Sequence, residues 1–376
     1  LYQVERGGSY TEGIAGFPAA INPLLSQYND ADRDLCALIF EGLVAYGPDG
    51  APAPRLAERW DISSDGKTYT FTLRQGVRWH DGAPFGAGDV VFTAGLLQDP
   101  DFLALEASGQ YEYWRDVKIE QVDEHTVRFV LPEPYAPFLD FAAIGVLPAH
   151  LLSDVPPADL PRAQFNARPV GTGPFMVDAV SAGQVTLARN PLYYGEQPQL
   201  ESLTFRFYAD AENLLAAHDR GEIDGLAQVT PATLARVRSD RSLNLHSSRL
   251  PKYSMILFNV RDADLPFAQP DVRQALMWGL DRQGLVDRLL DGQAVVIDSP
   301  ILPGTWAYNG DLPAYTHDAE KARRLLDDAG WRDADGDGVR EQDGRPLEFS
   351  LLTSDDATWN QVVAEVARQW AEIGVR

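Results

Sequence analysis

The last thirty residues of the chain, 347–376, restrict the possible fold classes more than any other part of the sequence. An apolar run at 347–353 predicts a strand, and the spacing of Val362 and Trp370 within 358–373 predicts an amphipathic helix. Gly374 follows this helix, and a second strand is expected to begin there. Strand, helix and strand in this order open a βαβ unit, so we expect an α/β fold. Since the chain stops at this point, we expect its second lobe to be incomplete.

The rest of the chain alternates short strand patterns with helical ones. Apolar residues alternate with polar ones over 67–74, which predicts a half-buried strand. Two strand patterns within 117–131 are joined by a short polar turn, which predicts a hairpin. A buried strand is expected at 253–260, and helical spacing covers 271–290 with an interruption near a glycine. A helix at 318–329 is expected to begin with an aspartate N-cap.

Length and charge narrow the class of protein. The 376 residues, 45% of them hydrophobic, exceed the usual size of one domain, so we expect two lobes, or two lobes and a subdomain. There are 32 basic and 55 acidic residues, a net charge of −23. This balance lacks the basic footprint of a nucleic-acid binder and repels anionic membranes. The single cysteine, Cys36, excludes an internal disulfide and is expected to be a buried, inert thiol.

Common enzyme motifs are not supported by the sequence. Gly66-Lys67-Thr68 lacks the earlier glycine of a phosphate-binding loop, because Asp61 stands there. The run that begins at Gly171 departs from a dinucleotide fingerprint and is expected to be a tight turn. The six histidines are scattered, and none forms a His-x-x-x-His pair. These motifs therefore give no support for an enzyme.

One stretch has the pattern of a calcium loop. Acidic residues stand at the first, third and fifth positions, where carboxylates converge on a hard cation, and Gly336 stands at the sixth, where the chain turns. The glutamate expected at the twelfth position is missing, since Gly344 stands there. The alternative is a solvated acidic turn; an ion bound here would have a structural role. The expected ligands are Asp333, Asp335, Asp337, Val339 through its carbonyl, and Glu341.

Aromatic residues in and near predicted loops are the other candidate binding groups. Small-ligand sites are commonly lined by aromatic side chains with a few polar groups. For any single aromatic residue the alternative is packing in the core or on the surface. Trp306 and Tyr308 are the strongest candidates, because they follow a loop in which a ring could face a cleft. The expected ligand-contacting residues are Tyr28, Asn29, Tyr111, Trp114, Tyr253, Asn259, Trp306 and Tyr308.

Nearly the whole chain resembles one known family. Its longest matching stretch runs from Pro54 to Phe92 and includes Trp79-His80-Asp81-Gly82. The stretches that carry the resemblance are 54–60, 64–74, 76–85, 89–92, 169–175, 189–194, 221–224, 258–259, 271–276 and 318–331. They resemble the family 5 extracellular solute-binding proteins, which bind dipeptides, oligopeptides and nickel. In that family the stretch around His80 looks structural, so we do not expect His80 to bind ligand.

The resemblance implies a bilobal α/β clamp of the periplasmic-binding-protein type II class, with an extra subdomain. Residues 1–45 and 165–257 would form lobe I, and 46–164 its subdomain. Residues 258–376 would form an incomplete lobe II. The later part of a complete family member, which carries an acidic residue for the amino terminus of a peptide in oligopeptide-binding relatives, cannot be placed here.

The same resemblance implies the function, and it implies a protein that is not an enzyme. The protein would be an extracytoplasmic receptor of an ABC importer that binds a solute, most of all a peptide, in an interlobe cleft and delivers it to a membrane permease. It would act as a monomer without a required cofactor, in the periplasm or lipid-anchored on the outer face of the cell membrane. A metal chelate, a sugar or another solute could replace the peptide. The sequence leaves two further functions open, an acidic secreted hydrolase and a sensor that signals without transport.

Overall fold

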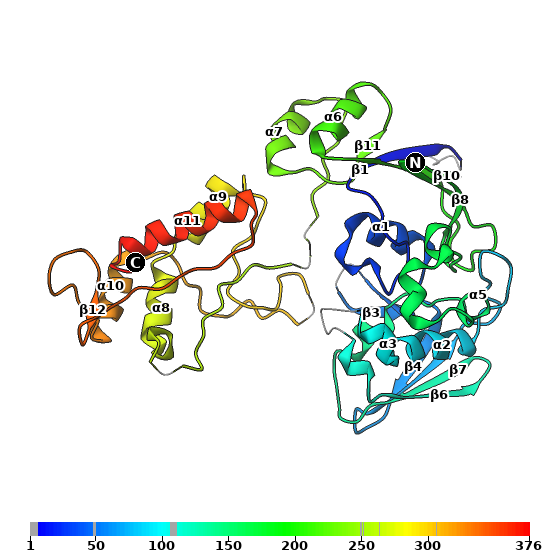
Figure 1. Ribbon diagram of the computed structural model, residues 1–376, viewed down its shortest axis with the longest axis horizontal. Coiled ribbons are helices and arrows are strands. Elements are labelled where there is room, and N and C mark those ends of the chain that lie inside the picture. The colour runs from blue at the N-terminus through cyan, green and yellow to red at the C-terminus, as the bar shows by residue number, and fades with distance from the viewer. Residues whose placement is uncertain are drawn as a thin grey trace. The chain divides into compact units, whose positions relative to one another are not determined.

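The chain forms two compact units. The computed structural model describes residues 7–47, 50–105, 111–248, 250, 252–262, 264–305 and 307–376 (Figure 1). We call Leu1–Leu245 unit 1 and His246–Arg376 unit 2. This division falls inside the range expected for lobe I, and the expected limits of the lobes and the subdomain stay predictions.

A five-stranded sheet organises one part of unit 1 (Figure 1). Its strand order is β11-β1-β10-β9-β8. β1 lies parallel to β10 and β11, while β8, β9 and β10 pair antiparallel. Phe205 and Phe207 of β10 are buried in the core, as the alternation of a half-buried strand requires. The strands are β1 (Ser9–Ala15), β8 (Phe175–Ser181), β9 (Gln184–Arg189), β10 (Ser202–Tyr208) and β11 (Gly225–Leu226).

A four-stranded antiparallel sheet forms the other part of unit 1, in the order β4-β5-β7-β6. Its strands are β4 (Ala57–Ile62), β5 (Thr68–Leu73), β6 (Lys118–Asp123) and β7 (Thr126–Val130). Tyr69, Phe71 and Leu73 are buried on one face of β5, which confirms the predicted half-buried strand. β6 and β7 form the predicted hairpin. Both sheets contribute to one continuous core, and Cys36 is buried in it.

Helices and a small ribbon complete unit 1. α2 packs against β6 and β7, and α6 packs against β1 and β10. The helices are α1 (Asp30–Ile39), α2 (Ala87–Gln98), α3 (Pro100–Leu103), α4 (Phe138–Ala142), α5 (Ala149–Leu152), α6 (Ala211–Asp219) and α7 (Pro231–Ser239). The short 3-10 helices are η1 (Ser26–Tyr28), η2 (Glu112–Trp114), η3 (Pro157–Arg162) and η4 (Gln164–Ala167). The ribbon pairs β2 (Val44–Tyr46) with β3 (Pro52–Pro54).

Unit 2 is mainly helical where it has regular structure. The helical pattern over 271–290 forms two helices, α8 and α9, separated near Gly279 as predicted. The carboxylate of Asp318 accepts a hydrogen bond from Lys321 N (2.8 Å), which confirms the predicted N-cap of α10. The elements are η5 (Pro266–Ala268), α8 (Pro270–Trp278), α9 (Arg282–Leu289), α10 (Ala319–Asp328), β12 (Glu341–Gln342), β13 (Arg345–Pro346) and α11 (Ala357–Ala371).

Two predicted strands of unit 2 differ from the structure. Neither 253–260 nor 347–353 forms a strand in the structure. A strand requires a ladder of backbone hydrogen bonds to a neighbouring strand, which an apolar sequence alone does not supply. The predicted βαβ opening is nevertheless visible in two such bonds. Arg376 N donates to Leu347 O (3.0 Å), and Phe349 N donates to Arg376 O (2.9 Å), which is the pattern of a parallel pair. The end of the chain thus lies beside the extended segment that precedes α11.

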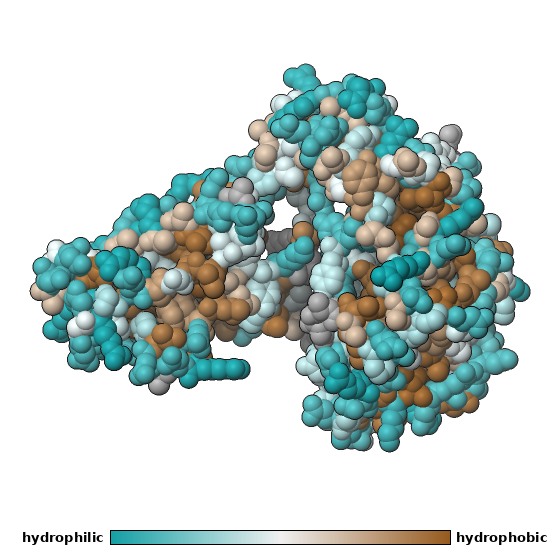
Figure 2. All heavy atoms as spheres, in the orientation of Figure 1, coloured by the Kyte–Doolittle hydropathy of each residue, from teal (hydrophilic) through white to brown (hydrophobic). Residues whose placement is uncertain are grey.

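The surface is mixed in character. Figure 2 shows hydrophobic residues among hydrophilic ones on the visible face of both units. In the part of the chain that the structure describes, no helix is both long and apolar enough to cross a membrane.

Candidate ligand-contacting residues and metal loop

Two of the expected ligand-contacting residues stand where α1 begins. Tyr28 ends η1, and its side chain is exposed. Asn29 is the N-cap of α1: its Oδ1 accepts from Asp32 N (3.2 Å), and its Nδ2 donates to Phe17 O (2.8 Å). The Asn29 amide therefore orders the start of a helix, and Tyr28 stands next to it on the surface.

Tyr111 and Trp114 are buried side chains of unit 1. The Tyr111 hydroxyl lies within hydrogen-bonding distance of Leu24 O (3.2 Å) and Gln27 Oε1 (3.1 Å). The Trp114 ring packs edge-on against Phe129 (centroids 5.8 Å apart). Both rings thus form part of the core, as is common for a single aromatic residue. Their contact with a ligand stays a prediction.

The exposed member of this aromatic group is Tyr113. Its side chain is 57% exposed, and its ring stacks on Tyr135 with the centroids 4.5 Å apart. These two rings border a small pocket with a cavity volume of about 50 Å³. The Trp114 Nε1 has no hydrogen-bond partner among the described residues. The pocket is lined by Tyr113, Trp114, Val117, Leu131, Pro132, Glu133, Tyr135, Phe138 and Phe141.

The remaining expected contacts lie in unit 2 or outside the described residues. Tyr253 and Tyr308 are exposed, on the segments before α8 and α10 respectively. Asn259 is exposed, and its Oδ1 accepts from Arg261 N (3.1 Å). Trp306, one of the two strongest candidates from the sequence, lies outside the described residues. The contact of these four residues with a ligand stays a prediction.

The acidic loop before β12 has the geometry expected of a cation loop. One carboxylate oxygen from each of its four acidic residues lies within 4.8 Å of the others. Gly336 N donates to Asp333 Oδ1 (2.7 Å), and Ala334 N donates to Glu341 Oε2 (3.0 Å), so backbone amides hold these carboxylates in place. Gly336 has a φ of +81°, which suits glycine at the turn. The converging residues are Asp333, Asp335, Asp337 and Glu341.

The fifth expected ligand, Val339, belongs to the same loop. Its side chain is buried, and its N donates to Asp337 Oδ1 (2.8 Å). These contacts order the loop through its own backbone, which a solvated acidic turn would also do. Calcium binding here stays a prediction.

A buried carboxylate that the sequence did not single out organises the centre of unit 1. Glu41 is 5% exposed, and its Oε1 pairs with Arg55 Nε (2.9 Å). Tyr193 and Tyr194 donate hydroxyl hydrogen bonds to the same oxygen (2.9 and 3.2 Å), and Thr172 donates to Oε2 (3.2 Å). Burial raises the pKa of Glu41, although Arg55 and the three hydroxyls lower it. The cluster therefore joins segments of unit 1 that lie far apart in the sequence.

His80 also has a structural position. Gly171 N donates to its Nδ1 (3.1 Å), so that nitrogen carries a lone pair, and Nε2 donates to Gly173 O (3.0 Å). The neutral imidazole is therefore satisfied at both nitrogens. Burial lowers the pKa of His80, against the hydrogen bond to Gly173 and the charge of Asp81. His80 locks the tight turn that begins at Gly171.

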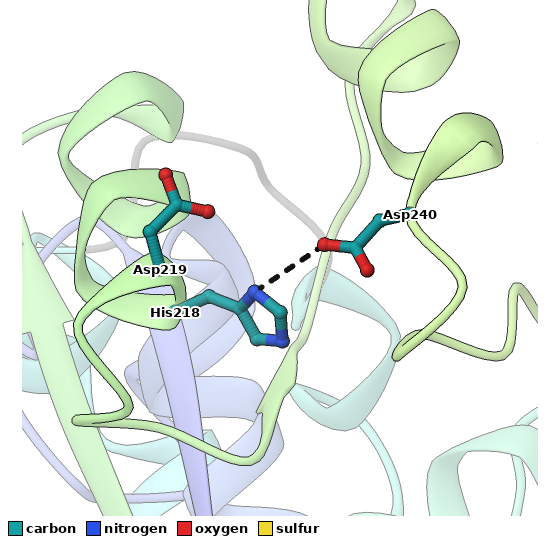
Figure 3. Close-up of side chains that lie close together, drawn as sticks. All are labelled: His218, Asp219 and Asp240. Carbon is teal, nitrogen blue, oxygen red and sulfur yellow. Dashed lines mark ion pairs between the residues drawn. The ribbon is translucent and has the colours of Figure 1, made fainter.

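The sequence did not predict a second cluster of metal-ligating groups. His218, Asp219 and Asp240 each offer one ligand atom, and these atoms lie within 4.8 Å of one another (Figure 3). His218 and Asp219 are adjacent in sequence, but Asp240 comes from a different helix end. Only the packing of α6 and α7 could have revealed this group.

Comparisons with known proteins agree with the fold and the resemblance. The family model for bacterial extracellular solute-binding proteins, family 5, middle region, matches residues 51–376. The dipeptide-binding protein of Escherichia coli is 34% identical over 74% of this chain and 55% of its own length. The oligopeptide-binding protein AppA of Bacillus subtilis is 30% identical over 99% of this chain and 68% of its own length. The chain thus spans roughly half to two thirds of these relatives.

A solved structure gives the same result. The crystal structure of NikZ from Campylobacter jejuni in complex with Ni(L-His) is 30% identical, with a TM-score of 0.75, and the match covers 98% of this chain and 72% of that one. This likeness confirms the predicted α/β fold of the periplasmic-binding-protein type. The chain belongs to the family 5 bacterial extracellular solute-binding proteins.

Proposed function

We propose that this protein is the extracytoplasmic solute-binding receptor of an ABC importer and that its ligand is a peptide. The observation that carries the proposal is the family match over residues 51–376, together with a dipeptide-binding and an oligopeptide-binding relative. Receptors of this class bind and release their ligand unchanged. The proposal therefore excludes turnover, which separates it from the acidic hydrolase.

A metal chelate is the second candidate ligand. NikZ, whose structure contains Ni(L-His), matches nearly the whole chain with a TM-score of 0.75. One fold can serve both ligand classes, because the ligand is selected by the residues of the site and not by the architecture. The exposed aromatic groups Tyr28, Tyr113, Tyr253 and Tyr308 would suit either a peptide or a chelate.

The partners and location follow from the same proposal. A membrane permease would receive the ligand, and the receptor would act as a monomer on the outer side of the cell membrane. It would be either free in a periplasm or held by a lipid anchor. Size-exclusion chromatography with light scattering tests the monomer, and ligand-stimulated ATPase activity of the reconstituted transporter tests the permease.

Native mass spectrometry tests the ligand. The protein is purified without denaturation, and spectra are recorded before and after a denaturing wash. An adduct of peptide mass that is lost on denaturation supports a peptide receptor, whereas an adduct of nickel with histidine supports the chelate. If no adduct is present, titration calorimetry with a peptide panel and with nickel–histidine follows. Cleavage of an added peptide would contradict the receptor and support the hydrolase.

A further inference from the structure

His218 has a buried ring nitrogen that its protein surroundings do not satisfy. Its Nδ1 is buried and has no hydrogen-bond partner among the described residues. The nearest carboxylate oxygen, Oδ2 of Asp240, lies 3.9 Å away, beyond the ~3.2 Å limit of a good N–H···O bond. Figure 3 shows the imidazole turned toward Asp240, with Asp219 beside it at the end of α6. The pair is thus too far apart to be hydrogen-bonded, and only 13% of the His218 side chain is exposed.

This separation suits two ligands of one metal ion. Zinc binds imidazole nitrogen at ~2.0–2.1 Å and carboxylate oxygen at ~2.0–2.2 Å, so two ligands of a tetrahedral ion lie ~3.4 Å apart. A small side-chain movement would bring His218 Nδ1 and Asp240 Oδ2 to that distance. Asp219 offers a third ligand atom within 4.8 Å of both. Water would complete the coordination.

The electrostatic setting favours a cation. Asp219 is the last residue of α6, and Asp240 is the C-cap of α7, so the negative ends of two helix dipoles meet carboxylates. The backbone N–H and the hydroxyl of Ser242 both donate to Oδ1 of Asp240 (2.8 and 2.6 Å), so its other oxygen, Oδ2, is the one that faces His218. Arg236 supplies one positive charge through its ion pair with Asp219. It competes for one ligand and leaves the facing pair, His218 and Asp240, available.

We propose that His218, Asp219 and Asp240 form a divalent transition-metal site, of the zinc class, that joins the ends of α6 and α7. The imidazole selects zinc-class ions over calcium and magnesium, which prefer oxygen ligands alone. All three residues belong to unit 1, and none of them is an expected ligand-contacting residue, so the proposal does not rest on the proposed peptide-binding function. It would be a structural metal site, separate from the acidic loop of unit 2.

Zinc titration of the full chain by calorimetry tests the site. Calcium is kept in excess, so that oxygen-only sites do not contribute. The wild-type protein is expected to bind one zinc ion, and His218→Gln and Asp240→Asn are each expected to weaken that binding at least ~10-fold. The controls are His317→Gln, which removes an exposed imidazole, and Asp333→Asn, which alters the acidic loop. Both controls are expected to bind zinc like the wild type.

Two further measurements stay informative even if His218→Gln and Asp240→Asn do not fold. Arg236→Ala frees Asp219 from its ion pair and is expected to tighten zinc binding a few-fold. X-ray absorption of the zinc-loaded wild type is expected to show one imidazole and otherwise oxygen ligands. The proposal is overturned if the wild type binds no zinc, if His317→Gln weakens binding as much as His218→Gln, or if the spectrum shows two or more imidazoles.

Discussion

The two units differ in how far their extended segments pair with neighbouring strands. In unit 1 the strands are joined into sheets of five and four, and a core runs beneath both sheets. In unit 2 the apolar segments 253–260 and 347–353 carry strand-like sequences without forming strands, and the side chains of Leu257 and Leu352 are 81% and 92% exposed. Unit 1 thus combines two paired sheets with its core, whereas unit 2 has one short ribbon, β12–β13, and depends mainly on the hydrophobic cluster between its helices.

The largest expected effect tests that dependence. Trp370 is 3% exposed, its ring packs against Phe349 (centroids 5.6 Å apart), and its Nε1 donates to Leu276 O (2.9 Å). Trp370→Ala is expected to destabilise unit 2 by about 4 kcal/mol, from lost contacts and the cavity. Calorimetry should show a lowered transition for unit 2 beside an unchanged one for unit 1. The control, Leu352→Ala, is expected to change the free energy of unfolding by less than ~0.5 kcal/mol. An equal loss from Leu352→Ala would show that its face is covered and would break the comparison.

The next effect belongs to unit 1. Glu41→Ala leaves Arg55 and the hydroxyls of Thr172, Tyr193 and Tyr194 without their shared acceptor. Because the carboxylate is buried and Arg55 only half-exposed, we expect a loss of about 3 kcal/mol. Urea unfolding followed by circular dichroism measures it.

The matched control for Glu41 is an exposed pair of the same type. Glu58 pairs with Arg59 (2.8 Å) on the surface, and Glu58→Ala is expected to change the free energy of unfolding by less than ~1 kcal/mol. If both variants lose the same amount, the buried cluster does not hold the centre of unit 1 together.

Calcium provides a test confined to unit 2. If the loop from Asp333 to Glu341 binds calcium, free calcium at 100 times the Kd is expected to stabilise unit 2 by about 2.7 kcal/mol. The melting temperature of unit 2 should rise while that of unit 1 stays constant, and Asp333→Asn should remove the rise. If calcium raises the melting temperature of unit 2 equally in Asp333→Asn, or does not raise it in the wild type, the solvated acidic turn is favoured.

Local patterns in the sequence predicted local structure well. The alternation of Tyr69, Phe71 and Leu73 predicted β5, and Asp318 predicted the start of α10, because each signal depends on residues close in the chain. The parallel pairing of β1 with β10 could not be derived in this way, since it joins segments nearly two hundred residues apart and no local pattern encodes the register.

The candidate site shows the same limit. The sequence identified the acidic loop, whose carboxylates lie within a few residues of one another. It grouped Tyr111 and Trp114 with exposed aromatics, because an aromatic residue near a loop has the same composition signal whether it packs inward or outward. It missed the cluster around Glu41, whose partners Arg55, Thr172 and the adjacent Tyr193 and Tyr194 come from three separate parts of the chain. Burial of a polar group is a property of the packed structure, so it could only be seen there.

The smallest expected effect concerns protonation in unit 1. The folded pKa of His80 is lowered, so the unfolded chain binds the proton more readily. The stability that the neutral ring contributes is fully present above the unfolded value of ~6.5 and is lost as the pH falls through the folded pKa. A proton on Nδ1 would displace the Gly171 N–H, a loss of about 1 kcal/mol.

His80→Gln tests this step, because it removes the titrating ring. The stability difference between the wild type and His80→Gln should shrink as the pH falls below ~6.5, the ordinary histidine value. Chemical unfolding at a series of pH values measures it. His317→Gln removes an exposed ring and should keep a constant difference over the same range. If the wild type and His80→Gln have parallel pH profiles, the ring does not act through its neutral form.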